Sequence, residues 1–277
     1  MAPDPREVAL RDARRLAVVL SELGHDVAQI GSGWMASDLP GSWADHASGL
    51  GVDGPVDEET IDRLVAFYGE RGRTPKIQVT PYQHPSLFER LGARGFSVDE
   101  LDSVLLHDLE RMPDPIVVPG LAFRSIDPEN EEDVALFRDS QVAGFFDAEP
   151  VPAGYLPITE RVARSIRCRL WLLELDGVVV GSGGLEPFEG SAVLICGCVH
   201  PEARRRGIQS AFIRYRVEQA RAAGLDYAII GSEPGAGTER NALRAGFVPM
   251  YTQFSLQLQR PREAPSSGAD SRKGDTP

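Results

Sequence analysis

The sequence is poor in cysteine. It has three in 277 residues, Cys168, Cys196 and Cys198, which are too few and too irregularly spaced for a disulfide framework or a zinc site. Cys196 and Cys198 stand close together in an apolar run, where a strand would place both side chains on one face as buried free thiols. A chain without structural disulfides is typical of a reducing compartment, so we expect a cytoplasmic protein.

The sequence also lacks a surplus of basic residues and any long apolar run. Lys and Arg number 29 against 41 Asp and Glu, which gives a net charge of −12 and an isoelectric point near 4.9. This balance argues against a nucleic-acid partner, because phosphates need a positive face. No stretch approaches the length of a membrane span, and the apolar stretch 16–20 is shorter than the core of a secretory signal. Four histidines are scattered through the first half without ligand spacing, so no metal is expected: His25, His46, His84 and His107.

The pattern of apolar residues predicts a mixed α/β protein of the α+β type. The first half reads as helix 5–23, a glycine-rich strand-like stretch to 51, helix 56–72, strand 75–80, helix 84–96 and strand 103–110. The second half reads as strand 121–126, helix 129–145, a helix after Pro157, a hairpin that turns at Asp176-Gly177, strand 192–199, helix 209–224, strand 227–233, helix 238–247 and strand 251–259.

The two halves repeat one pattern. Segments 66–96 and 218–247 each read as helix, glycine, strand, a turn with proline, short helix and Gly-Phe. Self-similarity on this scale predicts two copies of one fold. We therefore expect lobes at 1–112 and 120–259, a proline-rich linker at 113–119 and a disordered tail at 260–277.

The stretch CVHPEARRRGIQSAF, residues 198–212, carries the clearest chemical signal. Arg204, Arg205, Arg206 and Gly207 stand between a predicted strand and a predicted helix. The first N–H groups of a helix lack partners, and together with the helix dipole they form an anion site. Glycine lets a phosphate approach the backbone, and arginines add charge-assisted hydrogen bonds. Three cations at this end oppose the dipole unless an anion is bound, so the pattern favours capture of a pyrophosphate.

This segment resembles the acyl-CoA signature of the GNAT superfamily of N-acyltransferases. The family signature reads Gln or Arg, two variable residues, Gly, one variable residue, then Gly or Ala; here Gln209 replaces the last small residue. TERNALRAGF, residues 238–247, is similar to the family's closing helix, and the resemblance covers residues 121–259. It implies two GNAT-like lobes, each with a mixed, mostly antiparallel central sheet flanked by helices.

The resemblance also implies an acetyl-CoA co-substrate and the residues that bind it. The backbone amides from Arg205 to Ser210 would hold the pyrophosphate, and the end of strand 192–199 would pair with the pantetheine arm as an added strand does. Asn241 lies near the place where the family contacts coenzyme. The expected coenzyme-binding residues are Cys198, Val199, Arg204, Arg205, Arg206, Gly207, Ile208, Gln209, Ser210 and Asn241.

The first half differs at the equivalent positions. With an offset of 152 read from the repeat, segment 204–207 falls opposite Val52, Asp53, Gly54 and Pro55, and 209–210 opposite acidic residues 57–58. Proline removes an N–H donor, and carboxylates repel a pyrophosphate. The first lobe is therefore expected to be degenerate, and to pack against the second lobe, to shape its acceptor pocket, or both.

Proton transfer is harder to assign. Acyl transfer needs a deprotonated amine and a protonated leaving thiolate. Many family members use a tyrosine in the closing helix as the acid and a glutamate on the strand before the signature as the base, but here the first position is Ala242 and the strand has no carboxylate. Other residues could take over proton transfer: Glu186 and Glu233 as bases, Tyr251 as a displaced acid, Ser232 as a donor to the thiolate and His200 as a base. Each of these residues could also have a purely structural role.

The implied reaction is transfer of an acetyl group from acetyl-CoA to a primary amine of a small molecule, by direct attack in a ternary complex. A cationic acceptor such as an amino sugar, amino acid or antibiotic fits the acidic composition. An acyl-CoA-binding sensor without turnover is the alternative, and the missing tyrosine and glutamate favour it. Acetylation of a protein tail and transfer of succinyl or malonyl groups also stay open, as does the choice between monomer and homodimer.

Overall fold

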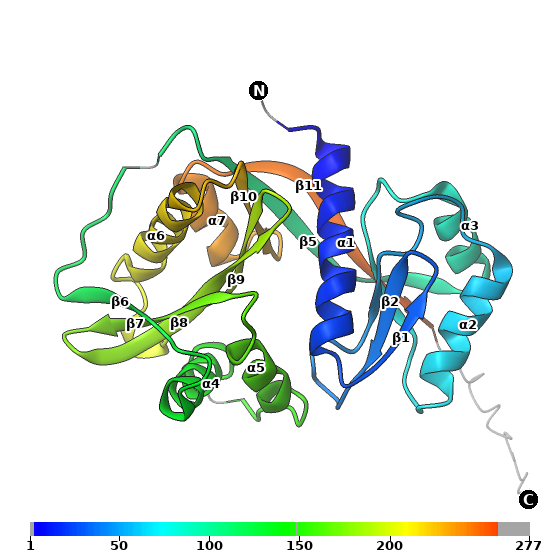
Figure 1. Ribbon diagram of the computed structural model, residues 1–277, viewed down its shortest axis with the longest axis horizontal. Coiled ribbons are helices and arrows are strands. Elements are labelled where there is room, and N and C mark those ends of the chain that lie inside the picture. The colour runs from blue at the N-terminus through cyan, green and yellow to red at the C-terminus, as the bar shows by residue number, and fades with distance from the viewer. Residues whose placement is uncertain (1–2, 113, 148, 260–277) are drawn as a thin grey trace, which may run out of the picture.

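The computed structural model of the protein describes residues 3–112, 114–147 and 149–259 (Figure 1). The predicted tail, 260–277, lies outside the described residues. The helices follow the predicted segments closely and are α1 (Pro5–Leu23), α2 (Glu58–Gly69), α3 (Pro85–Ala93), α4 (Glu131–Phe145), α5 (Tyr155–Ala163), α6 (Ile208–Ala222) and α7 (Gly237–Arg244). The strands are β1 (Asp26–Ile30), β2 (Gly33–Ser37), β3 (Ala47–Ser48), β4 (Lys76–Val79), β5 (Phe96–Asp108), β6 (Leu121–Ser125), β7 (Arg169–Leu175), β8 (Val178–Phe188), β9 (Ser191–Val199), β10 (Tyr227–Ser232) and β11 (Val248–Leu258).

The strands form one mixed sheet in the order β1-β2-β3-β4-β11-β5-β10-β9-β8-β7-β6. Within the described residues only the pairs β3–β4 and β9–β10 are parallel, and each belongs to one copy of the repeat. The predicted class, a mostly antiparallel sheet flanked by helices, is confirmed. The sheets of the two lobes are continuous, which the pattern of apolar residues does not predict.

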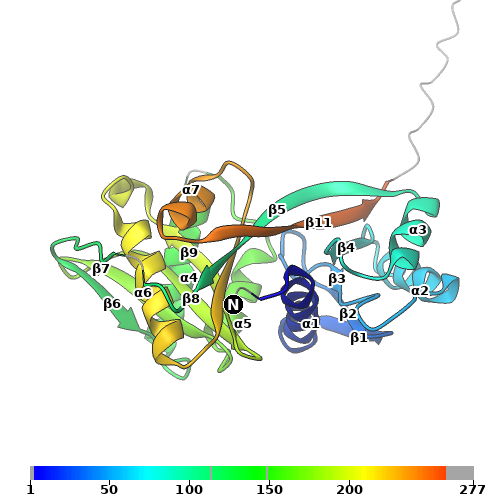
Figure 2. The same cartoon turned by 90° about the horizontal axis from the view of Figure 1, so that it is seen from above.

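Strands β5 and β11 join the lobes. The last strand of the second half, β11, lies between β4 and β5, while the last strand of the first half, β5, lies between β11 and β10. Figure 2 shows these two long strands side by side across the molecule. A boundary near residue 112 therefore divides the chain into two segments without dividing the sheet.

Helix α1 lies between the lobes (Figure 1). The side chain of Asp4 accepts a hydrogen bond from the backbone at the start of the helix, which is a favoured N-cap arrangement. Leu16 and Leu20 of α1 pack in one buried cluster with Phe137 of α4 and Ile158 of α5. Burial of each such side chain contributes about 2 kcal/mol. A helix of the first half thus completes the core of the second.

The helices of the second lobe cover both faces of its sheet. Helices α6 and α7 pack through Phe212, Val217 and Ala242 in one cluster with β7–β10, whereas α4 and α5 pack with α1 in another. This arrangement leaves the ends of β9 and β10 between α4, α6 and α7. No helix of the described residues has both the length and the apolar content needed to cross a membrane.

Candidate coenzyme and acceptor site

Strands β9 and β10 diverge, and this divergence opens the candidate site. They pair only over 191–193 and 227–229. Beyond these residues β10 stays with β5 and β9 stays with β8. Cys196 has a φ of +54°, and the register between β8 and β9 shifts beside it, which is a β-bulge. The segment 196–199 therefore has no strand paired with it on the β10 side.

A buried arginine supports this bulge from behind. Nη1 of Arg216, on α6, donates to the carbonyl oxygens of Gly184 at 3.2 Å and Ile195 at 3.3 Å, and its guanidinium lies 4.2 Å from the ring centroid of Phe212. A Cβ on Gly197 would lie 3.1 Å from Nη2 of the same arginine, so a residue without a side chain fits there. Arg216 thereby satisfies carbonyl groups that the irregular strand leaves free.

Helix α6 begins without a side-chain cap. Its N-cap, Gly207, has a φ of +80°, and Arg205 before it has a φ of +64°. The left-handed backbone turns the chain from β9 into the helix, and glycine adopts it at no steric cost. The first N–H groups of α6, on Ile208 to Ser210, therefore stay available to an anion.

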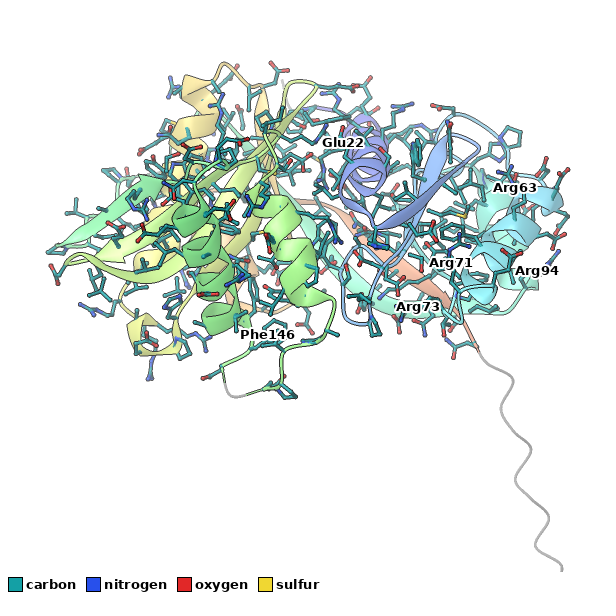
Figure 3. All side chains as sticks on the ribbon, turned by 60° about the horizontal axis from the view of Figure 1, so that its bottom comes forward. Glu22, Arg63, Arg71, Arg73, Arg94 and Phe146 are labelled. Carbon is teal, nitrogen blue, oxygen red and sulfur yellow. The ribbon has the colours of Figure 1, made fainter. Side chains whose placement is uncertain are left out.

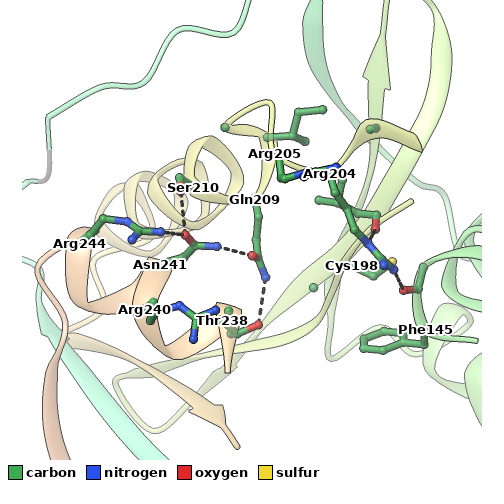
Figure 4. A pocket seen from close by; sticks show the side chains of 17 residues that line it. Phe145, Cys198, Arg204, Arg205, Gln209, Ser210, Thr238, Arg240, Asn241 and Arg244 are labelled. Carbon is green, nitrogen blue, oxygen red and sulfur yellow. Dashed lines mark hydrogen bonds between the residues drawn. The ribbon is translucent and has the colours of Figure 1, made fainter. Parts of the chain in front are cut away.

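A cavity of about 670 Å³ lies in front of this helix start (Figure 4). Helix α4, strand β9 and helices α6 and α7 surround it. Every expected coenzyme residue except Arg206 lines it, that is Cys198, Val199, Arg204, Arg205, Gly207, Ile208, Gln209, Ser210 and Asn241. Arg240 and Arg244, which also line it, were missed, although basic residues four apart on one helix lie on the same face.

Gln209, the departure from the family signature, ties α6 to α7. Its Nε2 donates to Oγ1 of Thr238 at 3.0 Å, and its Oε1 accepts from Nδ2 of Asn241. Asn241 Oδ1 in turn accepts from Oγ of Ser210 at 3.3 Å. Figure 4 shows this network along the wall of the cavity. The side chain of Gln209 is thus held against α7 by two hydrogen bonds.

Arg204 has a positioning role in this structure. Its Nε donates to the carbonyl oxygen of Val199 at 3.2 Å, and its Nη2 donates to that of Gly144 at 3.0 Å. The guanidinium therefore links the end of β9 to the end of α4. Arg205 lines the cavity, whereas Arg206 lies outside its lining. The positive charge at the cavity comes from Arg204, Arg205 and the two arginines of α7.

In the first lobe, side chains of the protein itself bond the backbone groups at the position that corresponds to the start of α6. Helix α2 has Asp57 as its N-cap, and the carboxylate accepts from the backbone N–H of Thr60 at 2.8 Å. Gln83 bonds both the N–H of Thr80 and the carbonyl oxygen of Leu50, at 2.6 Å each, and so joins β4 to the loop after β3. Since α2 begins at Glu58 and α6 at Ile208, Asp57 corresponds to Gly207, and the offset of 152 is wrong by two positions.

Two of the predicted catalytic residues belong to one buried polar network. Glu186, on β8, accepts from Arg15 at 2.6 Å through one oxygen and from Arg167 at 3.2 Å through the other. Tyr251 donates to Asp12 at 3.0 Å, and Asp12 accepts from Arg15 at 2.7 Å. Burial and the neighbouring Asp12 raise the pKa of Tyr251 well above its usual value. These groups lie between α1, β8 and β11, and none lines the coenzyme cavity. This geometry argues for a structural role.

The remaining proton-transfer candidates lie apart from the cavity lining. Glu233 is exposed after β10, and its carbonyl oxygen accepts from Oγ of Ser232 at 3.2 Å. His200 is buried rather than part of an exposed loop, and its Nε2 lies 2.9 Å from Oγ of Ser140. Burial lowers the pKa of His200, with Glu202 opposing the shift. Ser232, Glu233 and His200 are therefore not brought together at one point.

A second cavity, of about 320 Å³, adjoins the first at β9. Its lining is Trp43, Gln141, Phe145, Phe146, Tyr155, Thr159, Val162 and Cys196. The sequence interpretation missed all of these as site residues except for noting Cys196 as a buried thiol. Burial, with Cys198 and other groups contributing, raises the pKa of the Cys196 thiol to about 12. Tyr155 is the one tyrosine that lines either cavity among the described residues.

Part of the sequence matches a known protein family. The family model described as acetyltransferase (GNAT) family matches residues 126–247. No curated protein matches the sequence. A GCN5-related N-acetyltransferase from Kribbella flavida has a TM-score of 0.65 at 16% identity, over 90% of this chain and 96% of that one.

Two further solved structures share the fold. A GCN5-related N-acetyltransferase from Sphaerobacter thermophilus has a TM-score of 0.56 at 15% identity, over 78% of this chain and 72% of that one. A tandem GNAT protein from the clavulanic acid biosynthesis pathway has a TM-score of 0.57 at 15% identity, over 91% and 94%. Likeness at such identities shows the fold, tandem arrangement included.

Proposed function

Because residues 126–247 form a GNAT acetyltransferase domain, we propose that the protein transfers an acetyl group from acetyl-CoA to a primary amine of a small molecule. The observation that carries this proposal is the uncapped start of α6 at the wall of a cavity that also reaches the unpaired segment of β9. An acyl-CoA needs both features, an anion site for its pyrophosphate and an edge of backbone groups for its pantetheine amides.

The residues of the cavity suit acetyl-CoA in charge and shape. The N–H groups of Ile208 to Ser210 would hold the pyrophosphate, with Arg205, Arg240 and Arg244 adding positive charge. The backbone of β9 from 196 to 199 would bond the pantetheine arm. The thioester supplies an activated acetyl group, and this assignment places its acetyl end toward the bulge at Cys196, next to the second cavity.

The reaction forms a C–N bond, breaks the C–S bond and moves one proton from the amine to the leaving thiolate. Tyr155 is the proposed proton donor, because it lines the cavity beside the bulge. Burial and the nearby Cys196 and Cys198 raise its pKa, so its hydroxyl keeps the proton at neutral pH. We expect Tyr155→Phe to lower kcat at least ten-fold in steady-state assays and to leave KM for acetyl-CoA unchanged. A drop confined to KM would contradict this role.

The test of coenzyme binding uses the difference between the two lobes. Gly207→Asp places at the start of α6 the carboxylate that caps α2, and a Cβ at this position would make only ordinary contacts, with Val118 at 3.7 Å and Ile116 at 3.9 Å. Gly207→Ala carries the same backbone strain without the charge, and Asp57→Gly is the reciprocal change in the first lobe. Calorimetric titration of acetyl-CoA is expected to give one-to-one binding that falls at least ten-fold in Gly207→Asp and stays unchanged in Asp57→Gly.

The outcomes separate the alternatives. Equal binding by Gly207→Asp and Gly207→Ala would place the pyrophosphate elsewhere. No binding to the natural protein would exclude both the transferase and the acyl-CoA sensor. Binding without release of thiol in the presence of an amine panel would favour the sensor.

A further inference from the structure

The second cavity has an unusual lining for a site that receives an amine. Its walls are aromatic or aliphatic for the most part, with Trp43, Phe145, Phe146 and Tyr155 as the large side chains, and none of the described residues that line it is charged. Phe146, labelled in Figure 3, directly follows α4. Apolar walls with a few polar groups are typical of sites that enclose an apolar ligand group. An acceptor recognised through several positive charges would need carboxylates here.

The position of this cavity identifies its occupant as the second reactant. Phe145 lines both cavities, and along β9 Cys196 lines the second cavity while Gly197 and Cys198 line the first. The bulge at Cys196 is therefore the point where the two spaces meet. A molecule in the second cavity would face the acetyl end of a coenzyme bound in the first.

One wall comes from the first lobe. Trp43 lies in the loop after β2, and its carbonyl oxygen is 2.8 Å from Nδ1 of His46. The same loop is fixed to the segment before α5, since the N–H of Gly154 donates to the carbonyl oxygen of Pro40 at 2.9 Å. An ion pair between Asp38 and Arg161 of α5 holds the beginning of the loop. The degenerate lobe thus places a tryptophan over the acceptor side of the working lobe.

Besides the hydroxyls of Tyr155 and Thr159, the cavity offers the side-chain amide of Gln141 to an amine. Nε2 of Gln141 donates to Oγ of Ser182 at 2.8 Å and to the carbonyl oxygen of Cys196 at 2.7 Å, which fixes the orientation of the amide. Its Oε1 accepts no hydrogen bond from the described residues. An amide oxygen is an acceptor for the N–H groups of an amine. The cavity therefore combines an oriented amide acceptor with mostly apolar walls.

We propose that this cavity binds an amine whose carbon skeleton is apolar, an arylalkyl or branched alkyl amine, with Trp43 against the apolar group and Gln141 at the nitrogen. This inference rests on the proposed function and names its substrate class. It takes the place of the amino sugar, amino acid or antibiotic that the acidic composition suggests. The acidic residues that dominate the net charge do not line the cavity.

The experiment compares two amines of equal charge. 2-Phenylethylamine and ethanolamine each carry one ammonium group at pH 7.5, and each is titrated calorimetrically into the full-length protein saturated with coenzyme A. We expect 2-phenylethylamine to bind at least ten-fold more tightly. Trp43→Ala is expected to remove most of this preference, and Trp43→Tyr, which keeps a large aromatic ring, is expected to restore it.

The controls separate this inference from the proposed function. Acetyl-CoA is titrated into the same variants, because Trp43 lies outside the coenzyme cavity and its substitution should leave that affinity unchanged. Intact coenzyme binding with equal affinity for the two amines would overturn the apolar acceptor. If Trp43→Ala still prefers 2-phenylethylamine, the first lobe does not contribute to acceptor binding through Trp43. If the natural protein does not bind acetyl-CoA, the proposed function itself is contradicted.

Discussion

His46 shows how a single buried residue makes stability depend on pH. Its side chain is 8% exposed, and its Nε2 has no hydrogen-bond partner among the described residues. Burial lowers the pKa of His46 to about 4, whereas an unfolded histidine titrates near 6.5. Between these values the unfolded chain binds more protons, so the free energy of unfolding falls as the pH falls. The contribution of His46 to this loss amounts to about 3 kcal/mol across the window.

Urea unfolding at pH 7 and pH 5 checks this expectation. The natural protein should lose more stability over this interval than His46→Gln, which has no proton to gain. Equal losses in the two proteins would show that His46 does not titrate in this window.

For Glu186, a structural role and a catalytic role predict opposite effects of substitution on stability and on kcat. Glu186→Gln leaves Arg15 and Arg167 facing a neutral amide in a buried site. The cost is about 1–3 kcal/mol, because the charge-assisted bonds to Glu186 are lost. Arg15 keeps Asp12 as a partner, and Arg167 keeps Glu22. We expect the melting temperature to fall while kcat, measured where the variant is folded, stays within two-fold. A large fall in kcat without loss of stability would identify Glu186 as the base instead.

At the scale of one element, the caps of α2 and α6 show opposite uses of the same position. Asp57 stabilises α2 by bonding its first turn, whereas Gly207 leaves the first turn of α6 free. Asp57→Ala should lower the free energy of unfolding by about 1 kcal/mol, and Asp57→Gly by a few tenths. Chemical denaturation measures both. An Asp57→Ala variant as stable as the natural protein would mean that the side-chain bond to Thr60 contributes little.

The elements could be predicted from the sequence far better than their pairing. Caps, glycines and apolar periods are local, so α1 is predicted at its exact bounds and the turn at Asp176-Gly177 is found. The neighbours of β11 are set by contacts with residues far away in the chain, which no local pattern encodes. Most residues of the candidate coenzyme cavity could be proposed from the sequence because they stand in one continuous segment, 197–210. Trp43 and Gln141 could not, since they reach the second cavity from separate lobes, Trp43 on the loop after β2 and Gln141 on α4.

At the scale of the whole molecule, the exchange of β5 and β11 predicts one cooperative unfolding unit. Single-tryptophan variants can test this, because Trp34 lies in β2 of the first lobe and Trp171 in β7 of the second. Each variant keeps one of them, with the other tryptophans replaced by phenylalanine. Within each variant, the unfolding curve followed by tryptophan fluorescence should have the same denaturant midpoint and slope as the curve followed by circular dichroism. Separate transitions within one variant would show that the lobes unfold independently.

The position of β11 in the sheet also determines when the first lobe can complete its sheet during synthesis. The strands that flank it, β4 and β5, leave the ribosome well before it does, because about 140 residues separate β5 from β11 in the chain. At about 5–20 residues per second, the first lobe waits on the order of 10 seconds with the gap beside β4 open. Domains that fold one after another on the ribosome are complete before the next begins. Here the older half of the nascent chain closes only when the newest strand arrives.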